Sequence, residues 1–164
     1  MSIRVFIADD HPVVRDGLRL TIERSGKDIV VVGEAADGME LLRTAMTRPT
    51  DVYIVDITMP NLNGIEAVRE LLKRSAKAKI IILSLHDARA MVEEALAAGA
   101  RGYLTKEMAT RNVIEAVTEV HAGRYYLCPK VAHYVIQGRA RGERNTRWRV
   151  VAPSALTAQE KKVL

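Results

Sequence analysis

Acidic, hydroxyl and lysine side chains follow short apolar runs in this sequence of 164 residues. Asp9 and Asp10 follow the first run, Asp56 the third and Ser84 the fourth, while Lys106 comes just after the fifth. If the runs are parallel strands, these residues meet at one edge of the sheet, because sites in open parallel sheets form at the carboxyl ends of the strands. The sequence therefore predicts a cluster of three carboxylates, a hydroxyl and an ammonium group.

Carboxylates gathered in this way repel one another. At about 4 Å near a protein surface each pair costs roughly 4 kcal/mol, so Asp56 facing Asp9 and Asp10 needs compensation. Raised pKa values or a hard divalent cation can supply it. An all-oxygen pocket favours Mg²⁺, and once the charge is neutralised a carboxylate can attack phosphorus. The cluster predicts Mg²⁺-dependent transfer of a phosphoryl group to an aspartate.

The elements that would position these residues alternate along the chain. Short runs rich in β-branched residues predict strands buried on both faces, at 3–8, 29–32, 52–55 and 80–83, with a weaker run at 103–104. Apolar residues at spacings of three and four predict helices between and after them, at 13–25, 37–48, 64–75, 87–98 and 109–122. Pro12 suits a first helical position, and Gly99 suits a helix end. Five strand–helix units of this kind predict a parallel sheet with helices on both faces.

Charge divides the chain into two parts. Residues 1–120 hold 16 Lys and Arg against 18 Asp and Glu, whereas residues 121–164 hold 9 against 2. Five Arg fall within 138–149, a segment interpreted as a solvated tether, with contact to nucleic acid as the alternative. The two parts are expected to have different partners.

Composition excludes several classes of protein. No run approaches the roughly 18 apolar residues of a membrane span, and acidic residues interrupt the N-terminus where a signal peptide would stay apolar. We therefore expect a cytoplasmic protein. The single cysteine, Cys128, excludes an internal disulfide and has no companion for a structural zinc site.

Several motifs together resemble the receiver domain of two-component response regulators. They are the acid pair, the D-x-x-M-P-x-x-x-G pattern that begins at Asp56, then Ser84 and Lys106, in this order. The resemblance covers essentially all of residues 3–122. It implies an α/β, flavodoxin-like (βα)5 receiver, whose five-stranded parallel sheet has the order 2-1-3-4-5, with a helical or linker extension at the C-terminal side.

The resemblance also implies roles for the clustered acids. Asp56 matches the phosphoacceptor and Asp10 a direct Mg²⁺ ligand. Asp9 matches the second acid of the pocket, which often acts through water. The backbone carbonyl of Thr58 would be the remaining protein ligand.

The hydroxyl, lysine and aromatic positions match the switch residues of that family. Ser84 and Lys106 would each bind a phosphoryl oxygen, and Tyr103 matches an aromatic that turns inward when Ser84 moves. Thr58 and His86, each two residues beyond a key position, match residues that influence hydrolysis of the acyl phosphate. The implied molecule is a phosphoacceptor signalling protein with slow self-dephosphorylation, not an enzyme.

Simpler interpretations exist for single residues. Asp9 and Asp10 could cap the helix that follows them, and Ser84 could be an ordinary hydroxyl at a strand end. His11 and His86 lie nearer the pocket than the other histidines, but neither has a sequence partner that marks a metal site or a general base. Each simple interpretation can explain one residue, but none of them explains why these residue types occur together in this order.

The C-terminal part resembles response regulators of the NarL/FixJ family, with a LuxR-type helix-turn-helix. The segment LTAQEKKVL at 156–164 is similar to the opening of that DNA-binding domain, and Thr157 with Glu160 forms a capping box there. We expect a receiver at 1–122, a helical extension and Arg-rich linker at 123–155, and the start of a truncated helix-turn-helix at 156–164. DNA would be bound by the part of that domain that is missing.

The implied partner is a sensor histidine kinase, docking on the first helix around Val14, Arg15 and Leu18. The resemblance also implies homodimers on phosphorylation and no membrane contact. A stand-alone receiver that acts through protein contacts is the main alternative. An Asp-nucleophile phosphatase is more remote, because Thr58 stands where such an enzyme has its second aspartate.

Overall fold

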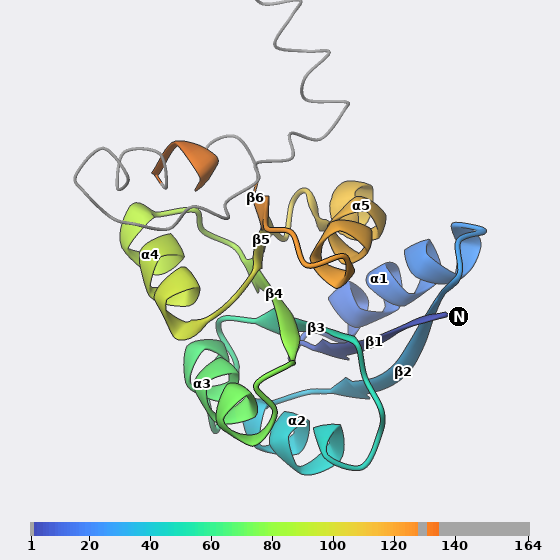
Figure 1. The fold of residues 1–164 in the computed structure, drawn as a ribbon, viewed down its shortest axis with the longest axis horizontal. Helices are drawn as coiled ribbons and strands as arrows, with labels where there is room; N and C mark the ends of the chain where they lie inside the picture. The colour runs from blue at the N-terminus through green and yellow to red at the C-terminus, as the bar shows by residue number, and fades with distance from the viewer. Residues whose placement is uncertain (1, 128–130, 135–164) are drawn as a thin grey trace, which may run out of the picture.

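The computed structural model describes residues 2–127 and 131–134. Within this part of the chain, six parallel strands form one sheet in the order β2-β1-β3-β4-β5-β6 (Figure 1). The strands are β1 Ile3–Ala8, β2 Ile29–Ala35, β3 Val52–Asp56, β4 Lys79–Ser84, β5 Gly102–Thr105 and β6 Tyr126–Leu127. The order predicted for the first five strands is confirmed.

The central strands are apolar because both of their faces are covered. Every residue of β3 is buried, and so is every residue of β4 except Lys79 at its start. β-Branched side chains suit such a doubly covered pleated surface. The parallel register places Asp56 beside Leu83, so β3 and β4 end at the same edge of the sheet.

Five helices connect the strands or follow them in the described residues. They are α1 Pro12–Arg24, α2 Gly38–Ala45, α3 Gly64–Arg74, α4 Arg89–Ala98 and α5 Ala109–His121. The carboxamide of Asn63 caps α3 by accepting a hydrogen bond from the backbone of Glu66. Gly99 ends α4 at φ 113°, where glycine avoids strain from a Cβ atom, as predicted.

The helices cover both faces of the sheet. Helices α1 and α5 pack together on one face, while α2, α3 and α4 lie side by side on the other (Figure 1). Each face has its own hydrophobic core, one centred on residues such as Phe6 and Ile82 and the other on Ile54 and Val117. The sheet therefore forms a rigid middle layer that fixes the strand ends.

The region after α5 differs from the prediction of a purely helical or linker extension. Residues 126–127 form β6, which pairs in parallel with β5, and 131–134 are helical. A backbone hydrogen bond attaches β6 to the start of β5: the Tyr126 N–H donates to the carbonyl of Arg101, which directly precedes β5, at 2.9 Å. The Arg-rich segment at 138–149, the capping box at Thr157 and Cys128 lie outside the described residues.

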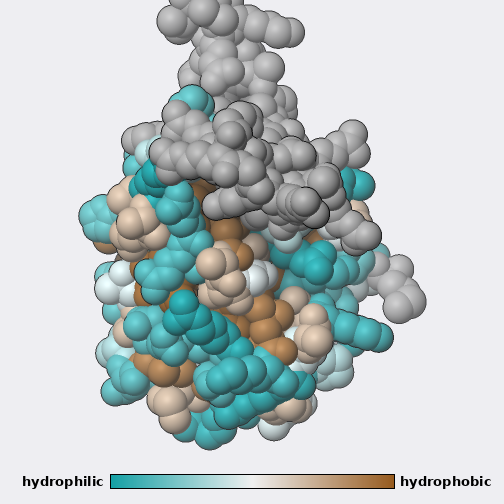
Figure 2. Space-filling model, turned by 60° about the vertical axis from the view of Figure 1, so that its left-hand side comes forward, coloured by the Kyte–Doolittle hydropathy of each residue, from teal (hydrophilic) through white to brown (hydrophobic). Residues whose placement is uncertain are grey.

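The surface of α1 also differs from the prediction. Leu18, expected at a docking surface, is fully buried in the core shared with α5, because it lies on the inward face of the helix. Val13, at the start of α1, is 82% exposed instead. Elsewhere hydrophilic and hydrophobic residues are interspersed, as on the face shown in Figure 2. No helix within the described residues is long and apolar enough to cross a membrane.

Candidate functional site

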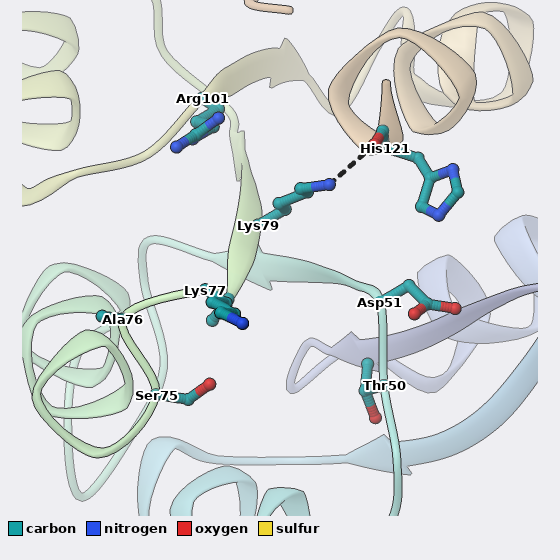
Figure 3. A pocket seen from close by; sticks show the side chains of 9 residues that line it. Thr50, Asp51, Ser75, Ala76, Lys77, Lys79, Arg101 and His121 are labelled. Carbon is teal, nitrogen blue, oxygen red and sulfur yellow. Dashed lines mark hydrogen bonds between the residues drawn. The ribbon is translucent and has the colours of Figure 1, made fainter. Parts of the chain in front are cut away.

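Charged side chains gather at both ends of the sheet. At the amino ends of β3, β4 and β5 lies a hollow of about 480 Å³ (Figure 3). Its charged lining residues are Asp51, Lys77, Lys79 and Arg101, and His121 also lines it. The carboxylate of Asp51 is held by Arg4, outside the lining, and Lys79 donates to the backbone carbonyl of His121 at 2.7 Å.

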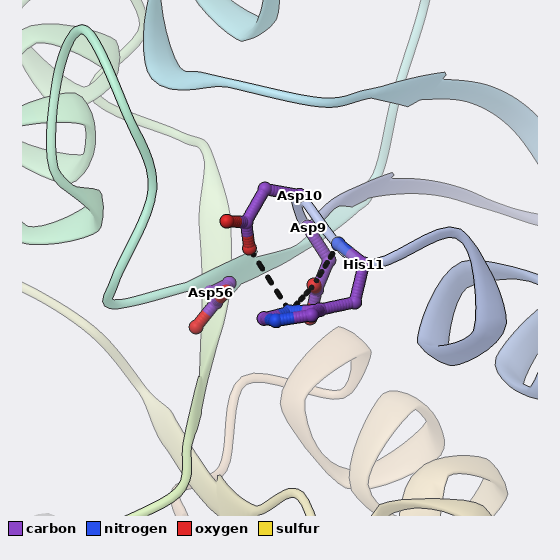
Figure 4. Close-up of side chains that lie close together, drawn as sticks. All are labelled: Asp9, Asp10, His11 and Asp56. Atoms are coloured by element: carbon purple, nitrogen blue, oxygen red, sulfur yellow. Dashed lines mark hydrogen bonds and ion pairs between the residues drawn. The ribbon is translucent and has the colours of Figure 1, made fainter.

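The predicted acids and the predicted lysine meet at the other end, beyond the carboxyl ends of the strands. Asp9 and Asp56 are 0% and 1% exposed, and Asp10 is partly buried beside them (Figure 4). The Lys106 ammonium lies 3.1 Å from Asp9 Oδ2 and 3.0 Å from Asp56 Oδ2. The convergence predicted from the strand ends is therefore confirmed for Asp9, Asp10, Asp56 and Lys106.

Burial sets the protonation chemistry of this cluster. Burial raises the pKa of Asp56 to about 6, with a further rise from the charge of Asp9, although contacts with Lys106 and the Thr58 N–H oppose the shift. Burial alone would lower the pKa of Lys106, but Asp56 and Asp9 raise it overall. Lys106 therefore stays an ammonium ion between two carboxylates, and its contacts only partly compensate the cost of a buried charge on Asp56.

Two carboxylate oxygens in the cluster lack a hydrogen bond. Within the described residues, Asp9 Oδ2 and Asp10 Oδ1 are buried and accept none; their close neighbours are the Lys106 ammonium, 3.1 Å from Asp9 Oδ2, and His11 Nδ1, 3.0 Å from Asp10 Oδ1. Ligand atoms of Asp9, Asp10, His11 and Asp56 all lie within 4.8 Å of one another. Because buried charges are paired or coordinate metals, this donor set fits a divalent cation.

The alternative in which the acid pair caps α1 is not supported. His11 occupies the N-cap position, and no side chain makes the cap hydrogen bond there. Asp9 Oδ1 instead accepts a hydrogen bond from the His11 backbone N–H at 2.8 Å. The acids of this turn face the cluster and leave the helix end uncapped.

The predicted switch residues lie around the same edge. Thr58 donates its backbone N–H to Asp56 Oδ1 at 3.1 Å. Ser84 is buried, and its Oγ accepts the His86 backbone N–H at 3.0 Å. Tyr103 is fully buried and points inward, with its hydroxyl donating to the His86 carbonyl at 2.7 Å. Ser84 and Tyr103 thus both hold the loop after β4, Ser84 through the N–H of His86 and Tyr103 through its carbonyl.

Sequence reasoning placed His11 near the pocket but named no partner that marks a metal site or a general base, and it missed the contacts that the side chain makes. His11 Nδ1 lies 3.1 Å from Asp9 Oδ1, 3.0 Å from Asp10 Oδ1 and 3.1 Å from Lys106 Nζ. Its place directly after the acid pair was the available signal. The direction of the ring depends on the turn that Asp9 Oδ1 closes, which spacing alone does not reveal.

Gly64 is a second residue that sequence reasoning left without a physical role. A Cβ atom at this position would collide with the backbone carbonyl of Asp56, and the Gly64 N–H donates to the Ile57 carbonyl at 2.9 Å. Glycine is required because the start of α3 packs directly on the end of β3. This close approach fixes the loop that carries Thr58.

The sequence and the fold were compared with those of known proteins. Residues 5–118 match the family described as "Response regulator receiver domain". The chain belongs to the response regulator receiver family. This receiver is 38% identical over 136 residues to the transcriptional regulatory protein DegU of Brevibacillus brevis, a match that covers 83% of this chain and 57% of that protein.

Further relatives of this receiver are regulators of the same type. The probable transcriptional regulatory protein NarL of Mycobacterium tuberculosis is 33% identical over 163 residues, covering 99% of this chain and 72% of that protein. A crystal structure of a LuxR-family two-component response regulator from Aurantimonas sp. SI85-9A1 superposes with a TM-score of 0.77 at 35% identity, covering 85% of this chain and 99% of that one. The receiver spans less than two thirds of DegU.

Proposed function

We propose that this receiver accepts a phosphoryl group on Asp56 and thereby controls transcription through a DNA-binding domain. The observation that carries the proposal is the buried cluster in which one ammonium, Lys106, contacts both Asp9 and Asp56 while Asp10 Oδ1 beside them is buried without a hydrogen bond. A sensor histidine kinase would supply the phosphoryl group. Asp10, Asp56 and the Thr58 carbonyl would hold Mg²⁺, with Asp9 as the second acid of the pocket.

The reaction uses the ionised carboxylate of Asp56. A carboxylate oxygen attacks phosphorus, the new O–P bond forms, and the bond from phosphorus to the donor's leaving group breaks with that group taking the electron pair. Bound Mg²⁺ would neutralise the charge of the transferred oxygens. Lys106 already lies 3.0 Å from Asp56 Oδ2, so its ammonium can move to a phosphoryl oxygen. The Thr58 N–H holds the other carboxylate oxygen in place.

The switch would run through the loop that follows β4. Moving a two-state equilibrium from 1:99 to 99:1 takes about 5.5 kcal/mol. Charge-assisted hydrogen bonds from Ser84 and Lys106 to the phosphoryl group would supply roughly 1.5 to 3 kcal/mol each. Ser84 Oγ must then leave the His86 N–H that it now holds, which frees the loop that Tyr103 also binds. Thr58 and His86 would tune hydrolysis of the acyl phosphate.

The proposed kinase surface uses the exposed start of α1. Val13 is 82% exposed and lies two residues after His11, so it stands beside the cluster at the same end of the sheet. Val14 and Arg15 are partly exposed, whereas Leu18 is excluded by its burial. The transcriptional output and the domain division at 122 and 155 are part of the same proposal, supported by relatives whose names describe transcriptional regulators.

Phosphoryl uptake tests the proposal. The full chain is incubated with acetyl phosphate and Mg²⁺, and intact mass is followed over time. We expect the wild type to gain one phosphoryl group, Asp56→Asn to gain none, and Asp51→Asn, the matched acid at the amino end of the same strand, to react like the wild type. Uptake by Asp56→Asn at the wild-type rate would overturn the assignment of the acceptor.

A further inference from the structure

We propose that His11 is a nitrogen ligand that makes the acidic site bind transition metals such as Ni²⁺, Zn²⁺ and Cu²⁺ in competition with Mg²⁺. This inference rests on the proposed cation site of Asp10 and Asp56 and adds a residue that sets its metal preference. Mg²⁺ prefers oxygen ligands and keeps several waters. Imidazole nitrogen suits zinc, copper and nickel. A histidine that reaches the site therefore favours the second group of metals.

The spacing of the ligand atoms fits coordination. Neighbouring ligands about 2.1 Å from an octahedral ion lie about 3.0 Å apart. His11 Nδ1 lies 3.0 Å from Asp10 Oδ1 and 3.1 Å from Asp9 Oδ1. Dashed lines mark both contacts in Figure 4. Asp9 is fully buried, and its Oδ2 accepts no hydrogen bond. The imidazole nitrogen thus lies at the distance of a neighbouring ligand from Asp10 Oδ1, a buried oxygen that accepts no hydrogen bond, and from one carboxylate oxygen of Asp9.

The charges around Nδ1 favour a further cation. The carboxylates of Asp9 and Asp10 lie 3.1 and 3.0 Å from this nitrogen. The Lys106 ammonium, 3.1 Å from it, is shared with Asp9 and Asp56. Three carboxylates therefore face a single ammonium in the cluster, and a metal ion bound through the lone pair of Nδ1 would offset the remaining negative charge.

The backbone holds the ring in this position. The His11 N–H donates to Asp9 Oδ1 at 2.8 Å, and the His11 carbonyl accepts from Val14 and Arg15 in the first turn of α1. Pro12 at the start of the helix fixes the chain direction after it. The side chain is 55% exposed, so solvent and metal ions can reach it. The ligand is thus both oriented and accessible.

Binding without any phosphodonor tests the inference. Dissociation constants for Mg²⁺, Ni²⁺ and Zn²⁺ are measured by calorimetry on the full chain carrying Cys128→Ser, which removes the thiol. His11→Asn is the test variant, because Asn is well tolerated at an N-cap. We expect it to weaken Ni²⁺ and Zn²⁺ binding at least about tenfold, the lower end of what even second-shell changes cost, and to leave Mg²⁺ binding within about twofold.

Matched controls separate the site from other histidines. His121→Asn, at the opposite end of the sheet, should leave all three constants unchanged, while Asp10→Asn should weaken all of them. Pulsed EPR of bound Cu²⁺ should show coupling to an imidazole nitrogen in wild type and His121→Asn. The same coupling should be missing from His11→Asn.

Each outcome bears on a different claim. Wild-type binding of Mg²⁺ that depends on Asp10, with Ni²⁺ and Zn²⁺ constants unaffected by His11→Asn, would overturn the role of His11 and keep the proposed function. Equal loss for all metals in His11→Asn would make His11 a residue that shapes the pocket, and it would also overturn the metal preference. Absence of Mg²⁺ binding in the wild type would count against the proposed function itself.

Discussion

The two ends of the sheet hold charged residues in opposite ways. At the amino end, around the hollow of about 480 Å³, Arg4 binds Asp51 at 3.0 Å and Lys79 binds a backbone carbonyl at 2.7 Å. At the carboxyl end, one ammonium serves two buried carboxylates, and buried oxygens of Asp9 and Asp10 accept no hydrogen bond.

The two ends of the sheet differ in how completely their carboxylates are paired. At the amino end the one carboxylate that lines the hollow, Asp51, is paired with Arg4, and the other charged groups of the lining are the cations Lys77, Lys79 and Arg101. The carboxyl end has charge that the protein alone does not compensate. Strain of this kind is expected at functional sites and is costly elsewhere. Substitutions at matched positions of the two ends test whether they differ in this way.

The largest difference is expected between the two lysines. Lys106→Met removes the cation shared by two buried carboxylates, and losing one partner of a buried ion pair costs about 3 to 5 kcal/mol. Lys79→Met removes one hydrogen bond to a carbonyl near the end of α5, worth about 1 kcal/mol. Urea unfolding in EDTA at pH 7.5 measures both free energies, and added Mg²⁺ should recover part of the loss in Lys106→Met. Equal losses would mean that the two ends do not differ.

The next difference concerns two glycines. Gly64→Ala places a Cβ against the backbone of Asp56, which must shift, at a cost of about 1 to 3 kcal/mol. Gly102→Ala, at the amino end of β5, meets Ile81 Cγ1 at 2.9 Å, a smaller overlap than that between a Cβ at Gly64 and the Asp56 carbonyl. Gly64→Ala should also slow phosphoryl uptake, whereas Gly102→Ala should not. Normal uptake by a folded Gly64→Ala protein would show that the loop geometry is not required.

The smallest difference concerns two aspartates, whose replacement by Asn should change the free energy of unfolding in opposite directions. The pKa of Asp56 is raised to about 6 by burial, so ionising it in the folded state opposes folding. Asp56→Asn should therefore stabilise the metal-free protein by about 1 to 2 kcal/mol above pH 6. The gain should shrink as pH falls from about 6 to about 4 and vanish below that, where the wild-type group is protonated in both states. Urea unfolding in EDTA over this pH range measures it.

Asp51 supplies the contrasting control. Hydrogen bonds from Arg4 hold the pKa of Asp51 below its ordinary value. Its contribution to stability is therefore present above the unfolded-state pKa and is lost as pH falls through the folded-state value. Asp51→Asn should destabilise the protein at neutral pH by no more than about 1 kcal/mol, the usual range of surface pairs. A stabilising Asp51→Asn would contradict the pairing described for the amino end.

Much of the fold could be predicted from periodicity. The run 3–8 matches β1, and the other strand predictions fall within observed strands, because strands buried on both faces need near-continuous apolar sequence. The positions of Asp9, Asp56 and Lys106 followed from the rule that parallel strands end at one edge. Pro12 and Gly99 marked helix ends through backbone preferences that are local.

The remainder depended on contacts that periodicity does not encode. The two residues of β6 are too few to show a pattern, and their pairing depends on how the chain passes β5 after α5. The resemblance placed Leu18 at the docking surface, yet Leu18 is buried and Val13 is exposed. The two residues are five positions apart, so they lie about 140° from each other around α1. The direction of the His11 ring depends on the turn that Asp9 Oδ1 closes with the His11 N–H, which the spacing of residues does not show.

The most direct test of the account is chemical identification of the phosphorylated residue. After reaction with acetyl phosphate and Mg²⁺, borohydride reduces an acyl phosphate to an alcohol, and peptide mass spectrometry locates it. We predict reduction at Asp56 alone, with none at Asp51 or at either member of the Asp9–Asp10 pair. A reduced residue elsewhere, or phosphate held only on a histidine, would contradict the assignment of the carboxyl end as a phosphoacceptor centre.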